Sequence, residues 1–208
     1  IAVAQFTNFT QDHLDYHGSM EGYWQAKRRL FDWPGLRAAV LNLDDPMGHA
    51  LQDHARGRHL ACWSYGLQEA VRLQAANIRY QAQGLVFDLI ERDDALSQVV
   101  DRATVQAPVI GTFNVSNLLA VLGAMVASGI PLADAAAIAG SLPPVPGRMQ
   151  TVRPSTNSNH KPLVVVDYAH TPDALEKALS TISAIVPEGG RLISVFGCGG
   201  DRDRGKRP

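Results

Sequence analysis

The feature that most constrains the fold is a regular change of pattern along the first part of the chain. Residues 1–6 and 36–43 are short apolar runs, which predict buried strands. Between them, residues 19–31 space apolar side chains three and four positions apart behind a serine, which predicts an N-capped helix. A second helix is predicted to begin in the turn 44–46. The alternation of strand and helix predicts an α/β layered sheet.

The middle of the chain changes character and then reaches a linker. Residues 59–108 hold several short β-type segments with partial alternation. Helices are predicted again over 114–128 and 131–140. The segment 142–148 (LPPVPGR) contains three prolines and one glycine, and it is therefore predicted to be a linker.

A second α/β run follows the linker. Residues 163–166 are Leu and Val only, the composition of a strand buried on both faces of a parallel sheet. Residues 171–173 (Thr-Pro-Asp) predict a helix start with threonine as N-cap. A further strand is predicted over 191–196. The pattern therefore predicts two domains, 1–146 and 147–208.

Composition excludes several classes of protein. The 208 residues include 19 Lys and Arg against 20 Asp and Glu, a net charge of −1. This balance argues against a polybasic surface, so nucleic acid is not an expected partner. No apolar run approaches the roughly 20 residues that span a bilayer, so membrane insertion is not expected. Two cysteines are too few for a disulfide framework and suit the cytoplasm. We expect the chain to be a piece of a longer protein.

Two candidate sites lie near the predicted first helix. Residues 12–18 (DHLDYHG) follow a strand, where α/β proteins place their sites, and they indicate either a metal or phosphate site or a polar capping loop. Lys27 lies on the apolar stripe of the helix, where a lysine normally buries its stem and leaves its ammonium in water. Alternatively, a desolvated lysine can add carbon dioxide, and the resulting carbamate can bind Mg²⁺.

Two further candidates lie at predicted strand-to-helix junctions. Asn114 and Asn117 are three residues apart at a helix start, where their amides suit either an adenine edge or simple N-capping by Asn114. Asp167 directly follows the strand 163–166. Its carboxylate suits either the hydroxyls of a ribose or the cap of the next helix.

The last candidate is the basic segment 200–207 (GDRDRGKR). Its spacing matches G-x-x-x-x-G-K, but Arg207 stands where a P-loop needs Ser or Thr for Mg²⁺, so we reject a P-loop. The cations Arg202, Arg204, Lys206 and Arg207 instead favour a site for an anion or an amino-acid carboxylate, with a solvated loop as the alternative.

Taken in order, these motifs resemble the Mur ligases, which form amide bonds with ATP during peptidoglycan synthesis. The resemblance covers essentially the whole chain and rests on 12–18, Ala26-Lys27, 111–117, Pro146-Gly147-Arg148-Met149, 167–173 and 197–208. The last two are most similar to members that add meso-diaminopimelate to UDP-N-acetylmuramoyl-L-alanyl-D-glutamate through an acyl phosphate. The resemblance implies a central ATP-binding α/β domain with a mixed sheet over 1–146. The first part of a Rossmann-like C-terminal domain would occupy 147–208.

The resemblance also implies roles for particular residues. His13 would be a ligand of a second Mg²⁺, and a carbamylated Lys27 would help to hold the same ion. Asn114 and Asn117 would contact the adenine of ATP.

The resemblance implies binding roles for four more residues, which lie in the predicted C-terminal domain. Arg148 would reach the ATP phosphates. Asp167 would hold the ribose, with His170 near the nucleotide. Arg202 would bind a carboxylate of the incoming diamino acid.

The implied cofactors are ATP and Mg²⁺, and the implied substrates are small molecules, in a cytoplasmic monomer. The family's Gly-rich phosphate loop, its metal-binding glutamate, its uridine-binding domain and its Asp-Asn-Pro-Arg motif are not among these residues, so we expect this chain alone to be inactive. The alternatives are an L-lysine-adding member, another Mur or folylpolyglutamate-type ligase, or a non-catalytic nucleotide-binding module.

Overall fold

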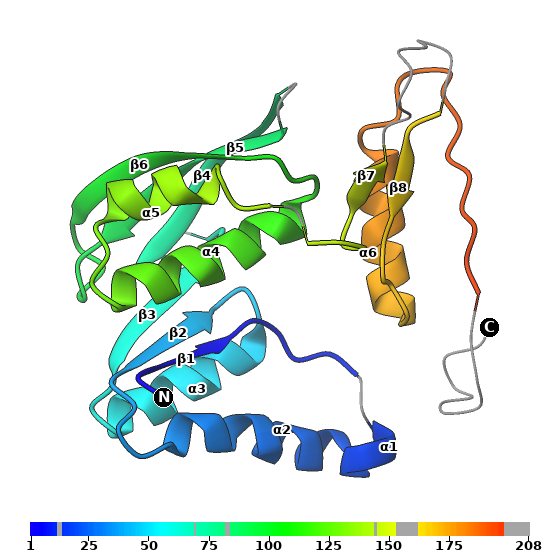
Figure 1. Ribbon diagram of the computed structural model, residues 1–208. Coiled ribbons are helices and arrows are strands. Elements are labelled where there is room, and N and C mark those ends of the chain that lie inside the picture. The colour runs from blue at the N-terminus through cyan, green and yellow to red at the C-terminus, as the bar shows by residue number, and fades with distance from the viewer. Residues whose placement is uncertain (12–13, 69, 82–83, 144, 153–161, 198–208) are drawn as a thin grey trace. The chain divides into compact units, whose positions relative to one another are not determined.

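The computed structural model describes residues 1–11, 14–68, 70–81, 84–143, 145–152 and 162–197 (Figure 1). The chain forms two compact units. The first contains residues 1–108 and 113–142, and the second contains 109–112 and the residues from 143 onward.

The first unit is a mixed sheet with helices. Its elements are β1 (Val3–Phe6), α1 (Leu14–His17), α2 (Met20–Arg28), the 3-10 helix η1 (Arg29–Asp32), β2 (Ala38–Asn42), α3 (Pro46–Gly57), β3 (Ala61–Gly66), β4 (Leu73–Gln81), β5 (Gly84–Arg92), β6 (Val99–Ala107), α4 (Thr112–Ala127) and α5 (Leu132–Ala139). The sheet order is β1-β2-β3-β4-β5-β6. Strands β1 to β4 pair in parallel, and β4, β5 and β6 pair antiparallel. The predicted α/β class with a mixed sheet is confirmed.

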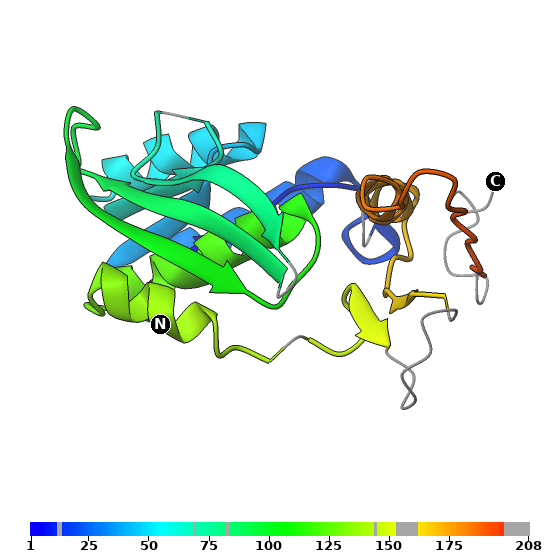
Figure 2. The ribbon, with the colours of Figure 1, turned by 90° about the horizontal axis from the view of Figure 1, so that it is seen from above.

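Helices cover both faces of the parallel part of the sheet (Figure 2). Every residue of β2 is buried. Ala39 and Leu41 belong to a core cluster that includes side chains of α2 and α3. Val40 alternates to the other face, where a Cβ on Gly123 of α4 would lie 2.8 Å from Val40 Cγ1. The absence of a side chain at Gly123 therefore lets α4 pack closely on β2.

Helices α2 and α3 begin with side-chain caps, as local capping rules predict. The predicted cap Ser19 is confirmed, because its Oγ accepts from Gly22 N at 3.1 Å. Asp45 caps α3 by accepting from Met47 N at 2.9 Å. The predicted cap at Asn114 is wrong, because α4 already begins at Thr112 and Asn114 lies within its first turn.

The second unit contains β7 (Gln150–Val152), β8 (Val164–Val166) and α6 (Pro172–Ser183) in its described part. Thr171 caps α6 as predicted, with its Oγ1 accepting from Ala174 N at 3.3 Å. The prediction of a doubly buried parallel strand at 163–166 is wrong. β8 pairs antiparallel with β7, and both Val164 and Val166 are exposed.

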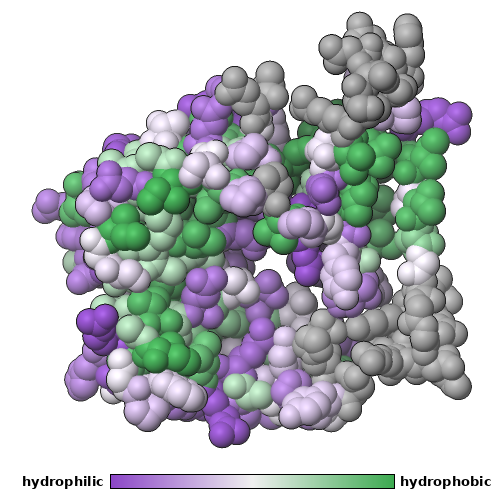
Figure 3. Space-filling model, in the orientation of Figure 1, coloured by the Kyte–Doolittle hydropathy of each residue, from purple (hydrophilic) through white to green (hydrophobic). Residues whose placement is uncertain are grey.

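The predicted strand at 191–196 is also wrong. Residues 191–197 have no regular secondary structure, and their exposed apolar side chains are part of the green surface in Figure 3. Among them, Val195 is 94% exposed. A β-type apolar sequence is buried only where neighbouring strands and helices enclose it. Among the described residues of this unit, β8 has β7 as its strand partner, and no strand pairs with 191–197.

Charged side chains join η1 to α3 on the surface of the first unit. Asp32 Oδ1 lies 2.8 Å from His54 Nε2 and 2.9 Å from Arg58 NH1. Burial alone would raise the pKa of Asp32, but the hydrogen bonds and charges of His54 and Arg58 outweigh it, and the pKa is lowered.

Asp32→Asn is expected to lower the free energy of unfolding at neutral pH by no more than about 1 kcal/mol, because solvent screens the pair. A lowered carboxyl pKa stabilises the fold above the unfolded value of about 3.9, and this stabilisation is lost as the pH falls through the folded value. Urea unfolding of both proteins between neutral and acid pH measures the difference. A difference that persisted unchanged in acid, or that Asp53→Asn at an exposed position of α3 reproduced, would contradict the assignment.

Within the described ranges, every helix is too short or too polar to cross a bilayer.

Candidate functional site

Three parallel strands end at the same edge of the sheet, where α/β folds place ligands. Hydrogen bonds join the ends of these strands and the loops that follow them. Tyr65 Oη donates to Phe6 O at 3.2 Å, and burial raises the pKa of Tyr65, with the Asp44 and Asp45 carboxylates adding to the effect. Asp44 Oδ2 accepts from Leu67 N at 2.9 Å. The edge is therefore internally fixed before any ligand arrives.

Lys27 is held against the loop that follows β1. The side chain is partly buried on α2, and its Nζ donates to Asn8 O at a long 3.4 Å. The same Nζ lies 4.9 Å from the centroid of the Tyr23 ring. A carbonyl oxygen and an aromatic face both attract an ammonium, so this side chain is directed to a defined place at the carboxyl edge of the sheet.

Aromatic rings pack against one another next to Lys27. The Phe9 ring lies 5.2 Å from the Tyr23 ring and 5.5 Å from the Trp24 ring, between centroids. His17, at the end of α1, stacks on Tyr23 at 5.0 Å with an interplanar angle of 23°. The described part of the candidate site 12–18 thus contacts the lysine-bearing helix. His13 lies outside the described residues, so its predicted place beside Lys27 stays a prediction.

The two asparagines of α4 lie side by side. Asn117 Nδ2 donates to Asn114 Oδ1 at 3.1 Å, which orients both amides on one face of the helix. Their predicted contact with adenine remains untested by this geometry.

In the second unit, Asp167 joins the loop after β8 to the residue before β7. Its Oδ2 accepts from Met149 N and its Oδ1 accepts from Ala169 N, both at 2.8 Å. The carboxylate is thereby fixed at the carboxyl end of β8, the position predicted for a ribose-binding group.

Arg148 and His170 lie against the same side chain, Tyr168. The Arg148 guanidinium carbon is 4.8 Å from the Tyr168 ring centroid, and the His170 ring is 5.1 Å from it. His170 Nδ1 also lies 3.1 Å from Tyr168 O. Three of the candidate residues, Arg148, Asp167 and His170, are thus brought together within the second unit. Arg202 lies outside the described residues.

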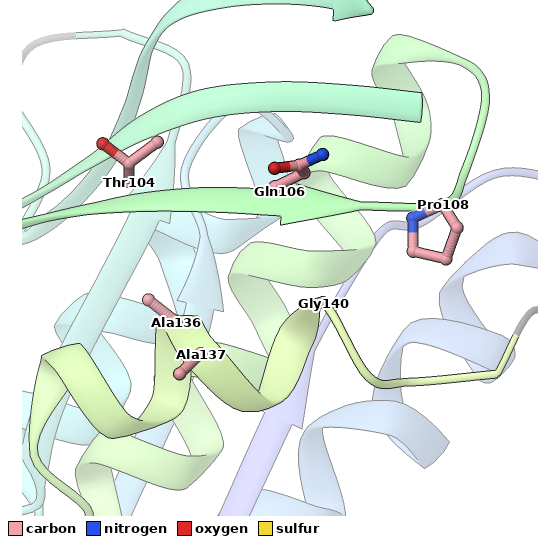
Figure 4. A pocket seen from close by; sticks show the side chains of 6 residues that line it. All are labelled: Thr104, Gln106, Pro108, Ala136, Ala137 and Gly140. Atoms are coloured by element: carbon pink, nitrogen blue, oxygen red, sulfur yellow. The ribbon is translucent and has the colours of Figure 1, made fainter. Parts of the chain in front are cut away.

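A groove of about 470 Å³ between β6 and α5 is separate from all these candidates (Figure 4). Its lining is uncharged and consists of Thr104, Gln106, Pro108, Ala136, Ala137 and Gly140. No candidate residue lines it, so it takes no part in the site described above.

The described side chains do not by themselves form a metal site. In the part of the chain that the structure describes, no group of three or more His, Cys, Asp or Glu side chains is arranged to hold a metal ion. Mg²⁺ prefers oxygen ligands, and Lys27 supplies none while it is an ammonium.

Sequence reasoning missed two residues of the edge, Asn42 and Asp45, because it interpreted the turn 44–46 only as the start of a helix. Asn42 Nδ2 donates to Thr7 O at 2.6 Å, and Asp45 Oδ2 accepts from Phe9 N at 2.7 Å. The usable indication was their position, because polar residues at the carboxyl end of a buried parallel strand, or just after it, lie at the ligand edge of an α/β sheet.

Two family models match the chain. The Mur ligase middle domain matches residues 1–125, and the Mur ligase glutamate ligase domain matches residues 147–208. The chain therefore belongs to the Mur ligase family.

The chain is similar over its whole length to diaminopimelate ligases. It is 54% identical to the UDP-N-acetylmuramoyl-L-alanyl-D-glutamate--2,6-diaminopimelate ligase of Acidovorax sp. (strain JS42) and 47% identical to the ligase of that name from Chromobacterium violaceum. In both comparisons 100% of this chain covers 40% of the relative.

Solved structures agree on the fold. A solved structure of a ligase with the same name matches this chain with a TM-score of 0.74 and 38% identity. The match covers all of this chain and 40% of the solved chain. A crystal structure of MurF from Acinetobacter baumannii matches with a TM-score of 0.70, and the match covers 87% of this chain and 37% of the MurF chain. At 22% identity, that second likeness supports the fold alone.

Proposed function

We propose that the protein to which this chain belongs is an ATP-dependent amide ligase of peptidoglycan synthesis. It adds meso-diaminopimelate to UDP-N-acetylmuramoyl-L-alanyl-D-glutamate. The observation that carries the proposal is the 54% identity, over the full length of this chain, to a relative of that name. The clustered candidate residues at the ends of the parallel strands and around Tyr168 support it.

The proposed chemistry has two steps. A substrate carboxylate oxygen attacks the γ-phosphorus of ATP, which forms an acyl phosphate and releases ADP. The amine of the diamino acid then adds to the acyl carbon, and the tetrahedral intermediate expels phosphate. Negative charge gathers on phosphoryl oxygens, so a cation such as Arg148 stabilises the first step. Arg148 is exposed on its loop, where a phosphate can reach it.

The nucleotide and amino-acid contacts are assigned to the remaining candidates. Asn114 and Asn117 hold the adenine, and their shared hydrogen bond supports a common orientation. Asp167 holds the ribose, with His170 beside the nucleotide. Arg202 binds a carboxylate of the incoming diamino acid.

We assign Mg²⁺ to His13 and to Lys27 in its carbamate form. The described residues do not by themselves form a metal site, and the ammonium of Lys27 would repel the ion. A carbamate on the same nitrogen would supply oxygen ligands. When bound, Mg²⁺ neutralises charge on the phosphates.

The organisation of the parent protein completes the proposal. Residues 1–146 form part of a central ATP-binding domain, and 147–208 begin a C-terminal ligase domain. The matches of two family models to 1–125 and 147–208 support this division. We place the parent protein in the cytoplasm as a monomer.

The test measures product and ADP formed by the full-length protein with ATP and the UDP-dipeptide. Three reactions are compared, with meso-diaminopimelate, with L-lysine and without an amino acid. We expect product with meso-diaminopimelate at a kcat/KM at least about 100-fold above that with lysine, which lacks the second carboxylate. Equal use of lysine would contradict the substrate, and no ADP with any addition would contradict the ligase. The isolated 208-residue chain should show no turnover.

A further inference from the structure

The backbone segment Thr7–Phe9, which follows β1, is bound by side chains from three other parts of the first unit. Asn42 at the end of β2 donates to Thr7 O at 2.6 Å. Asp45, before α3, accepts from Phe9 N at 2.7 Å. Lys27 of α2 donates to Asn8 O at 3.4 Å. Each residue of the segment therefore has a backbone group engaged by a distant side chain.

This arrangement is not a local turn. The partners of Thr7 and Phe9 lie 35 and 36 residues away along the chain. The segment belongs to no helix or strand, and three of its polar backbone groups are hydrogen-bonded by these side chains. The Phe9 ring also packs against Tyr23, whose face lies under the Lys27 amine. When the segment is held in place, two groups that contact Lys27 Nζ are held as well, namely the Asn8 carbonyl and the Tyr23 ring.

We propose that Asp45 and Asn42 are positioning residues for ligation, which hold Thr7–Phe9 so that the Lys27 nitrogen stays at its working place. The inference rests on the function proposed above and adds residues to its site. Catalytic groups must stay within about 0.5 Å of the productive geometry, and the residues that support them commonly contribute 10- to 100-fold to activity or metal affinity.

Asp45 has a property that an amide lacks. Its Oδ1 accepts from Met47 N and caps α3, while its Oδ2 accepts from Phe9 N. An asparagine has one acceptor oxygen and two N–H donors, so it can keep the cap but would place an N–H against Phe9 N–H. Asn and Asp are about equally good N-caps, so Asp45→Asn removes the bond to the segment while largely sparing α3.

The neighbouring residue provides a matched control. Asp44 also accepts a backbone hydrogen bond through Oδ2, from Leu67 N at 2.9 Å, but this bond leads to the end of β3. Asp44→Asn therefore makes the same chemical change without touching Thr7–Phe9.

The experiment compares the full-length wild type, Asp45→Asn and Asp44→Asn. Amide exchange over residues 7–11 is measured by mass spectrometry, and kcat and KM are measured per folded protein, with the folded fraction taken from thermal unfolding. For Asp45→Asn we expect at least tenfold faster exchange and a roughly 10- to 100-fold lower kcat, with the KM values for ATP, the UDP-dipeptide and the diamino acid each within about twofold. Asp44→Asn should leave exchange over residues 7–11 within about twofold of wild type and should lower kcat much less than Asp45→Asn does.

Asp45→Ser serves if Asp45→Asn folds poorly, because serine caps a helix but is too short to reach Phe9 N. Wild-type exchange or wild-type kcat in a folded Asp45 variant would overturn the inference, as would an equal effect of Asp44→Asn. A kcat loss explained wholly by the folded fraction would overturn it too. If the wild type does not ligate, the proposed function fails, while exchange over 7–11 still decides whether Asp45 holds the segment.

Discussion

Lys27→Arg in the full-length ligase is expected to lower kcat by roughly 100- to 1000-fold, the scale of losing one charge-stabilising group in a transition state. Arginine keeps the positive charge and the length needed to reach the Asn8 carbonyl and the Tyr23 ring. A guanidinium does not lose its proton in proteins, however, so it cannot add carbon dioxide. The substitution therefore separates a carbamate from a snorkelling cation, because only the carbamate is lost.

The control for this substitution is Lys177→Arg. Lys177 is an exposed residue of α6 that pairs with Asp173 at 2.9 Å, one helical turn away, and we expect kcat within about twofold of wild type. The native mass of the intact folded enzyme at mildly alkaline pH in bicarbonate should include one added carbon dioxide, which the Lys27→Arg enzyme lacks and which disappears in acid. A Lys27→Arg enzyme within about threefold of wild type, or an unmodified Lys27 in an active enzyme, would contradict the carbamate.

Features decided by neighbouring residues could be predicted from the sequence. The caps at Ser19 and Thr171 involve partners three residues away, Gly22 and Ala174. The apolar run at the centre of β2 predicted a buried strand, because parallel strands that are covered on both faces have nearly continuous apolar sequences, and every residue of β2 is buried.

Features decided by distant partners could not be predicted. Residues 163–166 and 191–196 have the composition of interior strands, yet composition does not specify which strands enclose them. The structure pairs β8 with β7 alone in the described part of the unit and leaves 191–197 exposed. In the same way, Asp45 looks like an ordinary helix cap in sequence. Its bond to Phe9 crosses 36 residues and becomes visible only when β1 and β2 pair.

The residues of the candidate site differ in the same way, since some could be predicted from nearby residues and others depend on distant partners. Lys27 was found through its place on an apolar helix face, and its contact with the loop after β1 depends on the α2 packing that this face creates. Asn42 was missed because its donor role toward Thr7 requires the parallel register of β1 and β2.

The largest effect on stability is expected from Phe31→Ala, which should lower the free energy of unfolding of the first unit by about 3–5 kcal/mol. Phe31 lies in η1, is 1% exposed, and belongs to the core cluster with Trp24 and Leu51. Its removal takes an aromatic ring from a packed interior and leaves a cavity that the sheet and α3 cannot close without moving. The Lys27 helix rests on this cluster, so the loss would reach the site as well.

Leu30→Ala is the matched control, since Leu30 precedes Phe31 in η1 but is 36% exposed. We expect a loss within about 0.5–1 kcal/mol for this exposed position. Urea unfolding of the 208-residue chain, followed by tryptophan fluorescence, measures both variants, because Trp24, Trp33 and Trp63 all lie in the first unit. Equal shifts in the two midpoints, at an unchanged dependence on urea, would show that Phe31 is not the anchor of this core.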